Sequence, residues 1–292
     1  MLARRPLLLL ATALPGVALA ATPPLVVTSF SILADLVGEI AGVRVKIVSL
    51  VGPDQDLHAY EPKPADLRTL AWADLLVLNG LGAEGWSARM AQASGFNGRV
   101  VVASSGVSPL HPAGAPGGPS DPHAWQDVAN VKLYVANIRD GLAAIDPAGA
   151  TAYRAAAAAY LAKLDRLDRD IRAAYAAIPQ ARRRVVTTHD ALAYYGRAYG
   201  LTFRAPLGLS SDSEPSAKGI AALERQIKAE HITALFVENI SNTTLLRQIA
   251  RDTGVRVGGV LYSDALSPPD GPAGTYIAMM RYNLGEIVGA LK

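Results

Sequence analysis

One segment limits the possible folds of this 292-residue chain more than any other. Residues 147–179 are dominated by Ala, Leu, Arg and Asp, with proline only at the two ends and a single glycine, Gly149. This composition predicts one uninterrupted helix. A helix of about 30 residues is roughly 45 Å long, which exceeds the width of a lobe of about 130 residues. We therefore expect a rigid backbone helix that connects two lobes.

Short β-rich runs alternate with helical segments on both sides of this helix. The predicted strands cover residues 25–28, 45–51, 75–78, 100–103, 185–187, 234–237 and 255–261. The predicted helices cover residues 32–41, 64–73, 191–199, 217–230 and 244–253. Strands that alternate with helices indicate parallel sheets. The expected fold class is α/β, with two small parallel-sheet lobes at 21–147 and 179–292 and a linking helix at 148–178.

A weak internal repeat supports two lobes of similar construction. Residues 26–34 and 185–193 are identical at five of nine positions, beginning with the same Val-Val-Thr. Each copy covers the end of a predicted strand and the residues that follow it.

The N-terminus has the layout of a secretory signal peptide. Arg4 and Arg5 precede an apolar run over residues 7–14, and a small-residue cleavage site ends at Ala20. The run is shorter than the ~20 residues that a membrane-spanning helix needs. We expect residues 1–20 to be removed from a protein exported to the periplasm, by either the general or the twin-arginine route. The chain has no cysteine, which excludes disulfides and a lipid-modified N-terminal Cys.

The charge balance argues against nucleic-acid partners. Two of the 28 Lys and Arg residues lie in the signal peptide, so the mature chain is nearly neutral against its 25 Asp and Glu residues. A nucleic-acid-binding protein would present a basic surface. The half-hydrophobic composition instead indicates a compact globular protein.

Four residues are candidate metal ligands. His58 follows the strand at 45–51, His189 follows the strand at 185–187, and Asp264 follows the strand at 255–261, where ligands of parallel sheets collect. His123 closes a Pro/Gly-rich loop. Three imidazoles and one carboxylate make an ordinary Zn²⁺ site, but the spacing alone indicates it only weakly and favours surface or core histidines. Because only neutral imidazole binds metal, affinity should fall as the pH drops through about 6.5.

The remaining polar candidates have lesser roles. Glu238 and Asn239 end the strand at 234–237 and could hold a ligand imidazole in place, or could simply end the strand. His111 lies in the loop, and His231 lies near a helix C-terminus, where a cation is favoured. We expect both of these histidines to be structural.

The sequence around the four candidates resembles a known family. The motifs are HAYEPKPAD from His58, DPHAWQDVAN around His123, HDALAYY from His189, and DALS from Asp264. Together they resemble the zinc/manganese-binding solute-binding proteins of ABC transporters, over essentially the whole mature chain. The resemblance implies two lobes joined by a rigid helix, one metal ion in the cleft between them, and His58, His123, His189 and Asp264 as its ligands. It also implies a protein without catalytic turnover.

Three departures from the family pattern refine this expectation. Val128 stands where the family commonly has proline, which should affect only a helix start. The loop at 111–122 lacks the His-rich and acidic run of many zinc-specific members. His189 stands where manganese members usually have glutamate, and nitrogen-rich ligation suits Zn²⁺ better than Mn²⁺. We therefore expect zinc as the cargo, with Mn²⁺ as the alternative.

The expected partner is an inner-membrane ABC permease, with a periplasmic metallochaperone as a second partner of a monomeric protein. A zinc-dependent hydrolase is the alternative from another class, since three histidines and an open position can activate water. An adhesin-like or metal-sensing role on the same fold is the third alternative.

Overall fold

The computed structural model describes residues 22–111, 117–211, 216–241 and 243–292, so the predicted signal peptide lies outside the described residues. Two four-stranded parallel sheets form the cores of two lobes, with the strand orders β2-β1-β3-β4 and β6-β5-β7-β8. The first sheet contains β1 (Leu25–Phe30), β2 (Lys46–Val51), β3 (Leu75–Leu78) and β4 (Arg99–Val102). The second contains β5 (Arg184–Val186), β6 (Thr202–Arg204), β7 (Ala234–Glu238) and β8 (Arg256–Leu261). The predicted fold class of two parallel-sheet α/β lobes is confirmed.

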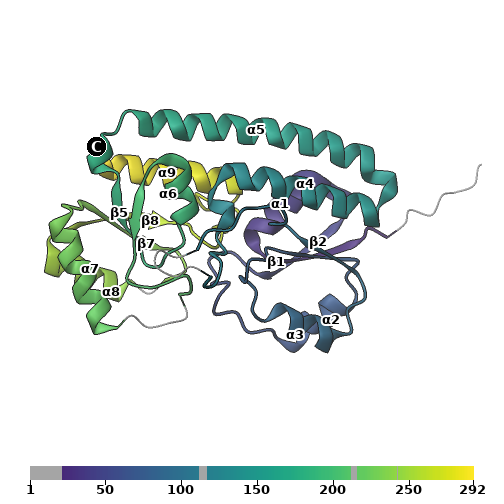
Figure 1. Cartoon of the computed structure of the whole chain (residues 1–292). Helices are drawn as coiled ribbons and strands as arrows, with labels where there is room; N and C mark the ends of the chain where they lie inside the picture. Colours follow the sequence, from purple (N-terminus) through teal and green to yellow (C-terminus); the bar gives the residue numbers. More distant parts are fainter. Residues whose placement is uncertain (1–21, 112–116, 212–215, 242) are drawn as a thin grey trace, which may run out of the picture.

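The linking helix is α5 (Ala150–Ala176), which runs along both lobes (Figure 1). A short 3-10 turn at Pro147–Gly149 precedes it. Its buried residues recur every three or four positions and form a stripe toward the lobes: Tyr153, Ala157, Tyr160, Leu164, Leu167, Ile171 and Tyr175. This amphipathic stripe is why the helix lies on the protein instead of standing free in solvent. The division into lobes at 21–147 and 179–292 stays a prediction.

The predicted helices are present as α1 (Ser31–Ala41), α2 (Pro64–Ala71), α6 (Ala193–Tyr199), α7 (Ala217–Ala229) and α8 (Thr244–Thr253). Three further helices were not predicted: α3 (Ser87–Ser94), α4 (Val128–Ile145) and α9 (Tyr276–Leu291). The strand β6 was also missed. Val128 is the first residue of α4, behind the capping side chain of Asp127, a position that tolerates proline equally well.

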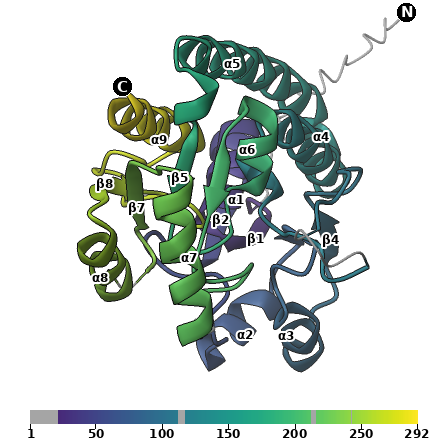
Figure 2. The ribbon, with the colours of Figure 1, turned by 60° about the vertical axis from the view of Figure 1, so that its left-hand side comes forward.

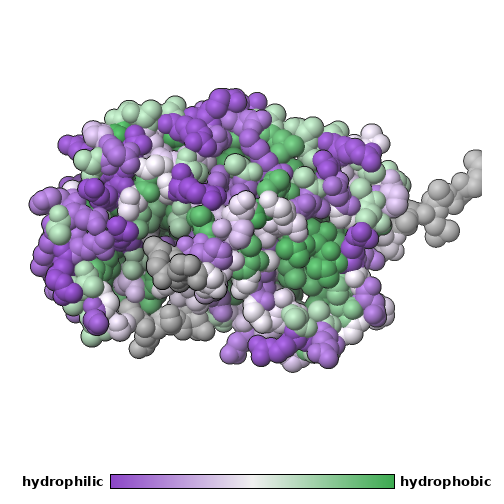
Figure 3. All heavy atoms as spheres, viewed as in Figure 1, coloured by the Kyte–Doolittle hydropathy of each residue, from purple (hydrophilic) through white to green (hydrophobic). Residues whose placement is uncertain are grey.

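The long helices gather on one side of the molecule. Figures 1 and 2 show α4, α5 and α9 along one side, with α2, α3, α7 and α8 on the other. The helix α9 packs against β8, α5 and α1, so it contacts parts of both lobes. Hydrophilic residues predominate at the end of the molecule formed by α7 and α8 (Figure 3). None of the helices in the described part of the chain is long and apolar enough to cross a membrane.

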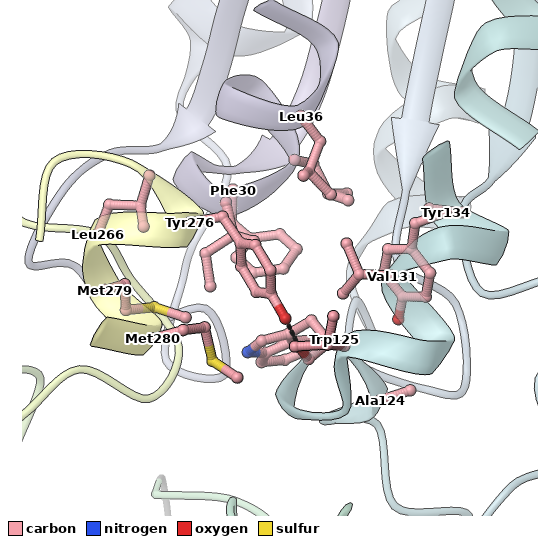
Figure 4. Packing of buried hydrophobic residues seen from close by; sticks show 14 of the residues in the cluster. Phe30, Leu36, Ala124, Trp125, Val131, Tyr134, Leu266, Tyr276, Met279 and Met280 are labelled. Carbon is pink, nitrogen blue, oxygen red and sulfur yellow. Dashed lines mark hydrogen bonds between the residues drawn. The ribbon is translucent and has the colours of Figure 1, made fainter. Parts of the chain in front are cut away.

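The hydrophobic core crosses the junction between the lobes. One large cluster contains side chains from the first sheet, from α4, α5 and α9, and from the inner part of the second lobe. At the junction, Phe30 packs on Trp125 with ring centroids 4.9 Å apart, close to Tyr276 and Leu266 (Figure 4). A second cluster, built around Leu235 and Ile249, is confined to the outer part of the second lobe. The functional candidates lie beside the shared core.

Candidate metal centre

The four candidate ligands come together although they lie up to 206 positions apart in the sequence. One donor atom from each of His58, His123, His189 and Asp264 can be chosen so that all four atoms lie within 4.8 Å of one another. His58 belongs to the loop after β2, His189 to the turn after β5, and Asp264 to the segment after β8. His123 immediately precedes a short 3-10 turn (Ala124–Gln126) that leads to α4. Three of the four thus follow the carboxyl ends of parallel strands, as the sequence predicted.

The donor atoms form a compact polyhedron. The Nε2 atom of His123 lies 3.1 Å from Nε2 of His58 and 3.3 Å from Nε2 of His189. The Asp264 Oδ2 atom lies 3.3 Å from Nε2 of His58 and 3.2 Å from Nε2 of His189. The other carboxylate oxygen, Oδ1, lies 3.7 Å from Nε2 of His123. All three imidazoles therefore direct the same nitrogen at one point.

This centre is closed to solvent. The side chains of His123, His189 and Asp264 are fully buried, and that of His58 is 6% exposed. Apart from the imidazole nitrogens that they face, the carboxylate oxygens of Asp264 have no hydrogen-bond partner among the described residues. A buried carboxylate without such partners is costly unless a cation or another ligand completes it. The donor set and its burial fit a metal ion.

Two buried carboxylates orient the imidazoles from behind. Nδ1 of His123 lies 2.8 Å from Asp121 Oδ1, and Nδ1 of His189 lies 2.7 Å from Glu238 Oε2. Glu238 also accepts hydrogen bonds through Oε1 from the backbone N–H groups of Thr188 and His189. A proton held on each Nδ1 leaves Nε2 free to bind metal. Glu238 was predicted from the sequence, whereas Asp121 was missed; its signal was its place two residues before His123.

Asn239 does not hold a ligand imidazole, which was one of the two roles considered for it. Its side-chain amide donates to Asp54 Oδ1 at 2.8 Å and to the Ala265 carbonyl at 3.4 Å, not to an imidazole. Asp54 lies in the loop that carries His58, and Ala265 is the neighbour of Asp264. In the same loop, Asp56 accepts hydrogen bonds from the His58 backbone N–H and from the Ser211 hydroxyl of the second lobe. These contacts join the two lobes beside the centre.

The mutual attraction of the cluster changes its titration. Burial lowers the pKa of His123, but the charge of Asp264 and the hydrogen bond to Asp121 outweigh it and raise that pKa to about 9. For His189, burial is likewise outweighed by Glu238 and Asp264, so its pKa is raised well above the usual range. Burial would raise the pKa of Asp264, but the two imidazoles hold it well below normal. Without metal, the centre therefore holds protons in the place of a cation.

The two other histidines lie outside this cluster. His111 is exposed, with Nδ1 3.1 Å from the Gly118 carbonyl oxygen. His231 is exposed just after α7 and has a positive φ of 51°. Neither histidine belongs to the cluster, and the structural roles predicted for them stay predictions.

Comparison with known proteins identifies the family. Residues 26–290 match the family described as the periplasmic component A of the zinc-uptake complex, ZnuA. This chain belongs to that family. It is 36% identical over 266 residues to the manganese-binding lipoprotein MntA of Halalkalibacterium halodurans, which covers 91% of this chain and 88% of that protein. It is 30% identical to the iron ABC transporter substrate-binding lipoprotein MtsA of Streptococcus pyogenes, over 90% of this chain and 87% of that one.

A solved structure of the family has the same fold. The periplasmic zinc-binding protein TroA from Treponema pallidum matches with a TM-score of 0.88 and 31% identity, over 92% of this chain and 99% of TroA. Family membership makes the protein a metal-binding, substrate-binding component of an ABC transporter, not an enzyme. Such a component has a membrane permease as its partner. The names of these relatives include manganese, iron and zinc, so they do not by themselves select the metal.

Proposed function

We propose that this protein captures Zn²⁺ in the periplasm and delivers it to an inner-membrane ABC permease. His58, His123, His189 and Asp264 are the proposed ligands, and Glu238 and Asp121 orient two of the imidazoles. The signal peptide at residues 1–20 directs export, and the mature protein acts as a monomer that a periplasmic metallochaperone can load.

The dimensions of the donor polyhedron carry this proposal. Four donors at the usual zinc distances of 2.0–2.1 Å around a tetrahedral ion are about 3.3 Å from one another. Four of the distances between donors of the centre are 3.1, 3.2, 3.3 and 3.3 Å, and all four donor atoms lie within 4.8 Å of one another. Three of the donors are imidazole nitrogens, which suit Zn²⁺ better than the harder Mn²⁺.

Manganese is the second candidate, because of the placement of Asp264. Both of its carboxylate oxygens face imidazole nitrogens, Oδ2 at 3.2 and 3.3 Å and Oδ1 at 3.7 Å. A carboxylate that binds through both oxygens would raise the coordination number, which suits a harder and larger ion. The similarity to the manganese-binding MntA supports this candidate as well.

A direct competition experiment tests the metal. The mature protein is equilibrated with equimolar Zn²⁺ and Mn²⁺ under a metal buffer, and the bound ions are quantified after gel filtration. We expect one bound ion per chain, with zinc in large excess over manganese. His189→Glu, which exchanges a nitrogen for oxygen donors, should narrow this preference. Preferential manganese binding by the unmodified protein would overturn the zinc assignment.

A further inference from the structure

The segment that carries Asp264 follows β8 in the second lobe, but most of its bonds are made to the first. We call residues 262–276 the Asp264 segment. The Ser263 carbonyl, next to Asp264, accepts two buried hydrogen bonds, from Trp125 Nε1 at 2.8 Å and from Gln126 Nε2 at 2.7 Å. Both donors come from the turn directly after His123. The residue preceding Asp264 is thus fixed by the same turn that carries another ligand.

The residues after Asp264 are held in the same way. The Leu266 N–H donates to the Ser31 hydroxyl at 3.0 Å, and its carbonyl accepts from the Asp54 N–H at 2.9 Å. At the far end, the Tyr276 N–H donates to Asp35 Oδ2 at 2.8 Å, and the Tyr276 hydroxyl donates to the Trp125 carbonyl (Figure 4). All of these partners belong to the first lobe. The contact from the second lobe, Asn239 to the Ala265 carbonyl, is long at 3.4 Å.

The shortest hydrogen bonds between the backbone of this segment and the second lobe are made at Tyr262. Its N–H donates to Asn283 Oδ1 at 2.9 Å, and its carbonyl accepts from Asn283 Nδ2 at 2.7 Å. Because Asn283 lies on α9, this pair fixes the end of β8 before the chain crosses to the first lobe. Tyr262 therefore marks the hinge between β8 and the Asp264 segment.

His189 is held in the opposite manner. Its backbone N–H donates to Glu238, and its carbonyl accepts hydrogen bonds from the Thr187 hydroxyl and the Ala191 N–H. All three partners lie in the second lobe. Among the four donors, His189 is the one whose backbone is fixed to this lobe.

We infer that Asp264 moves with the first lobe. Ser31 and Gln126 are the positioning residues that hold it in the centre. His58, His123 and Asp264 then form one three-donor unit, and His189 is the donor that departs when the lobes separate. The inference rests on the proposed metal site, and it identifies the step that releases the ion. The loss of one imidazole, not the loss of the carboxylate, begins release.

Substitution of the positioning residues tests the inference. Ser31→Ala and Gln126→Met each remove one hydrogen bond to the Asp264 segment without touching a proposed ligand. Each should weaken Zn²⁺ binding by about tenfold, the lower end of the effect of losing an outer partner of a metal ligand. Ser31→Thr, which keeps the hydroxyl, should restore wild-type affinity. Ser49→Ala is the matched control, because that hydroxyl bonds to the Val51 carbonyl within its own strand.

A double-mutant cycle separates positioning from general destabilisation. If Ser31 acts through Asp264, Ser31→Ala should have almost no further effect on affinity in an Asp264→Asn background. In a His189→Ala background it should keep its full, about tenfold, effect. Equal effects of Ser31→Ala in both backgrounds would overturn the inference.

Cobalt gives a second readout, on the single variants alone. The visible spectrum of bound Co²⁺ depends on the number and kind of its ligands. The spectra of Ser31→Ala and Gln126→Met should shift toward that of Asp264→Asn, while Ser49→Ala keeps the wild-type spectrum. Unchanged spectra and affinities in both variants would refute the positioning role while the proposed function stands. Failure of the wild-type protein to bind Zn²⁺ would instead refute the proposed function.

Discussion

The two lobes have the same construction but use equivalent positions differently. Their sheets share one strand order, and β1 and β5 occupy the same place in it. The repeat noted in the sequence aligns Phe30, just before α1, with His189, just after β5. Phe30 packs on Trp125 in the shared core, whereas His189 faces the other ligands. The same backbone position thus serves packing in one lobe and carries a proposed metal ligand in the other.

Each lobe also has a buried glutamate that joins the ends of two strands, and only the one in the second lobe contacts a candidate ligand. In the first lobe, Glu84 accepts hydrogen bonds from Ser29 and from the backbone N–H groups of Asn79 and Gly80, which joins the ends of β1 and β3. In the second lobe, Glu238 joins the ends of β5 and β7 and also meets His189.

The pKa values of the two glutamates are shifted in opposite directions. Burial raises the pKa of Glu84 against the opposing effect of its hydrogen bonds. Burial acts on Glu238 too, but the charge of His189 outweighs it and lowers that pKa. Both glutamates join two strands, but only Glu238 also has an imidazole beside it, that of His189.

The largest effect is expected where the lobes differ most. His189→Ala removes one of four donors and should weaken Zn²⁺ binding by at least about a hundredfold, since a zinc site of about 10–16 kcal/mol is shared among four ligands. The corresponding change in the first lobe, Phe30→Leu, should lower the melting temperature but leave affinity within about threefold, as packing changes cost stability. Competition titration against a zinc chelator measures both, with exposed His111→Ala as a neutral control. Equal losses from all three variants would contradict the assignment of His189.

The paired glutamates give the next effect. Glu238→Gln removes the negative charge behind His189 and should weaken Zn²⁺ binding about 10–100-fold. Glu84→Gln should destabilise the fold, because one of its oxygens becomes an NH₂ group facing backbone donors, yet should leave affinity nearly unchanged. Thermal melts and chelator titrations on the two variants separate these outcomes. A comparable loss of affinity in both would mean that the lobes do not divide the roles in this way.

The sequence was sufficient for the fold class, because that class depends on local composition and on the alternation of strands and helices. Three of the four clustered residues follow predicted strands, but His123 does not, and the complete set came from the resemblance of the surrounding motifs to a known family. Asp121 had a local signal that was overlooked, in its place two residues before His123. The attachment of the Asp264 segment had no such signal. It depends on side chains bonding to backbone groups more than 130 residues away, as from Gln126 to Ser263. The helix α9, which was also not predicted, lies at the same junction between the lobes.

The protons held by the centre predict a pH dependence stronger than the sequence suggested. Metal must displace the proton of His123, whose pKa is about 9 instead of 6.5, so affinity should already fall below pH 9. The expected slope is about tenfold per pH unit for each imidazole that loses a proton. The metal-free protein should show the reverse trend. The stability that protonated His123 contributes is complete below pH 6.5 and is lost as the pH rises through 9.

Chelator titrations and metal-free thermal melts between pH 6 and 9.5 measure these two trends. His111→Ala should leave both unchanged, because His111 lies outside the cluster. An affinity that is flat from pH 9 to 7 would contradict the raised pKa of His123.

The smallest effect is expected at the bond that joins the lobes beside the centre. Asn239→Ala removes the hydrogen bond to Asp54, which is worth about 1 kcal/mol, together with the long contact to the Ala265 carbonyl, and should speed zinc release about fivefold. Stopped-flow mixing of the zinc form with excess chelator measures the rate, and Asn97→Ala, which loses an exposed bond to Gly95 within the first lobe, is the matched control. Because this bond crosses between lobes, it resists the separation that removes His189 from the other three donors. Release that is unchanged in Asn239→Ala would show that the lobes are held together at other contacts, such as Ser211 on Asp56.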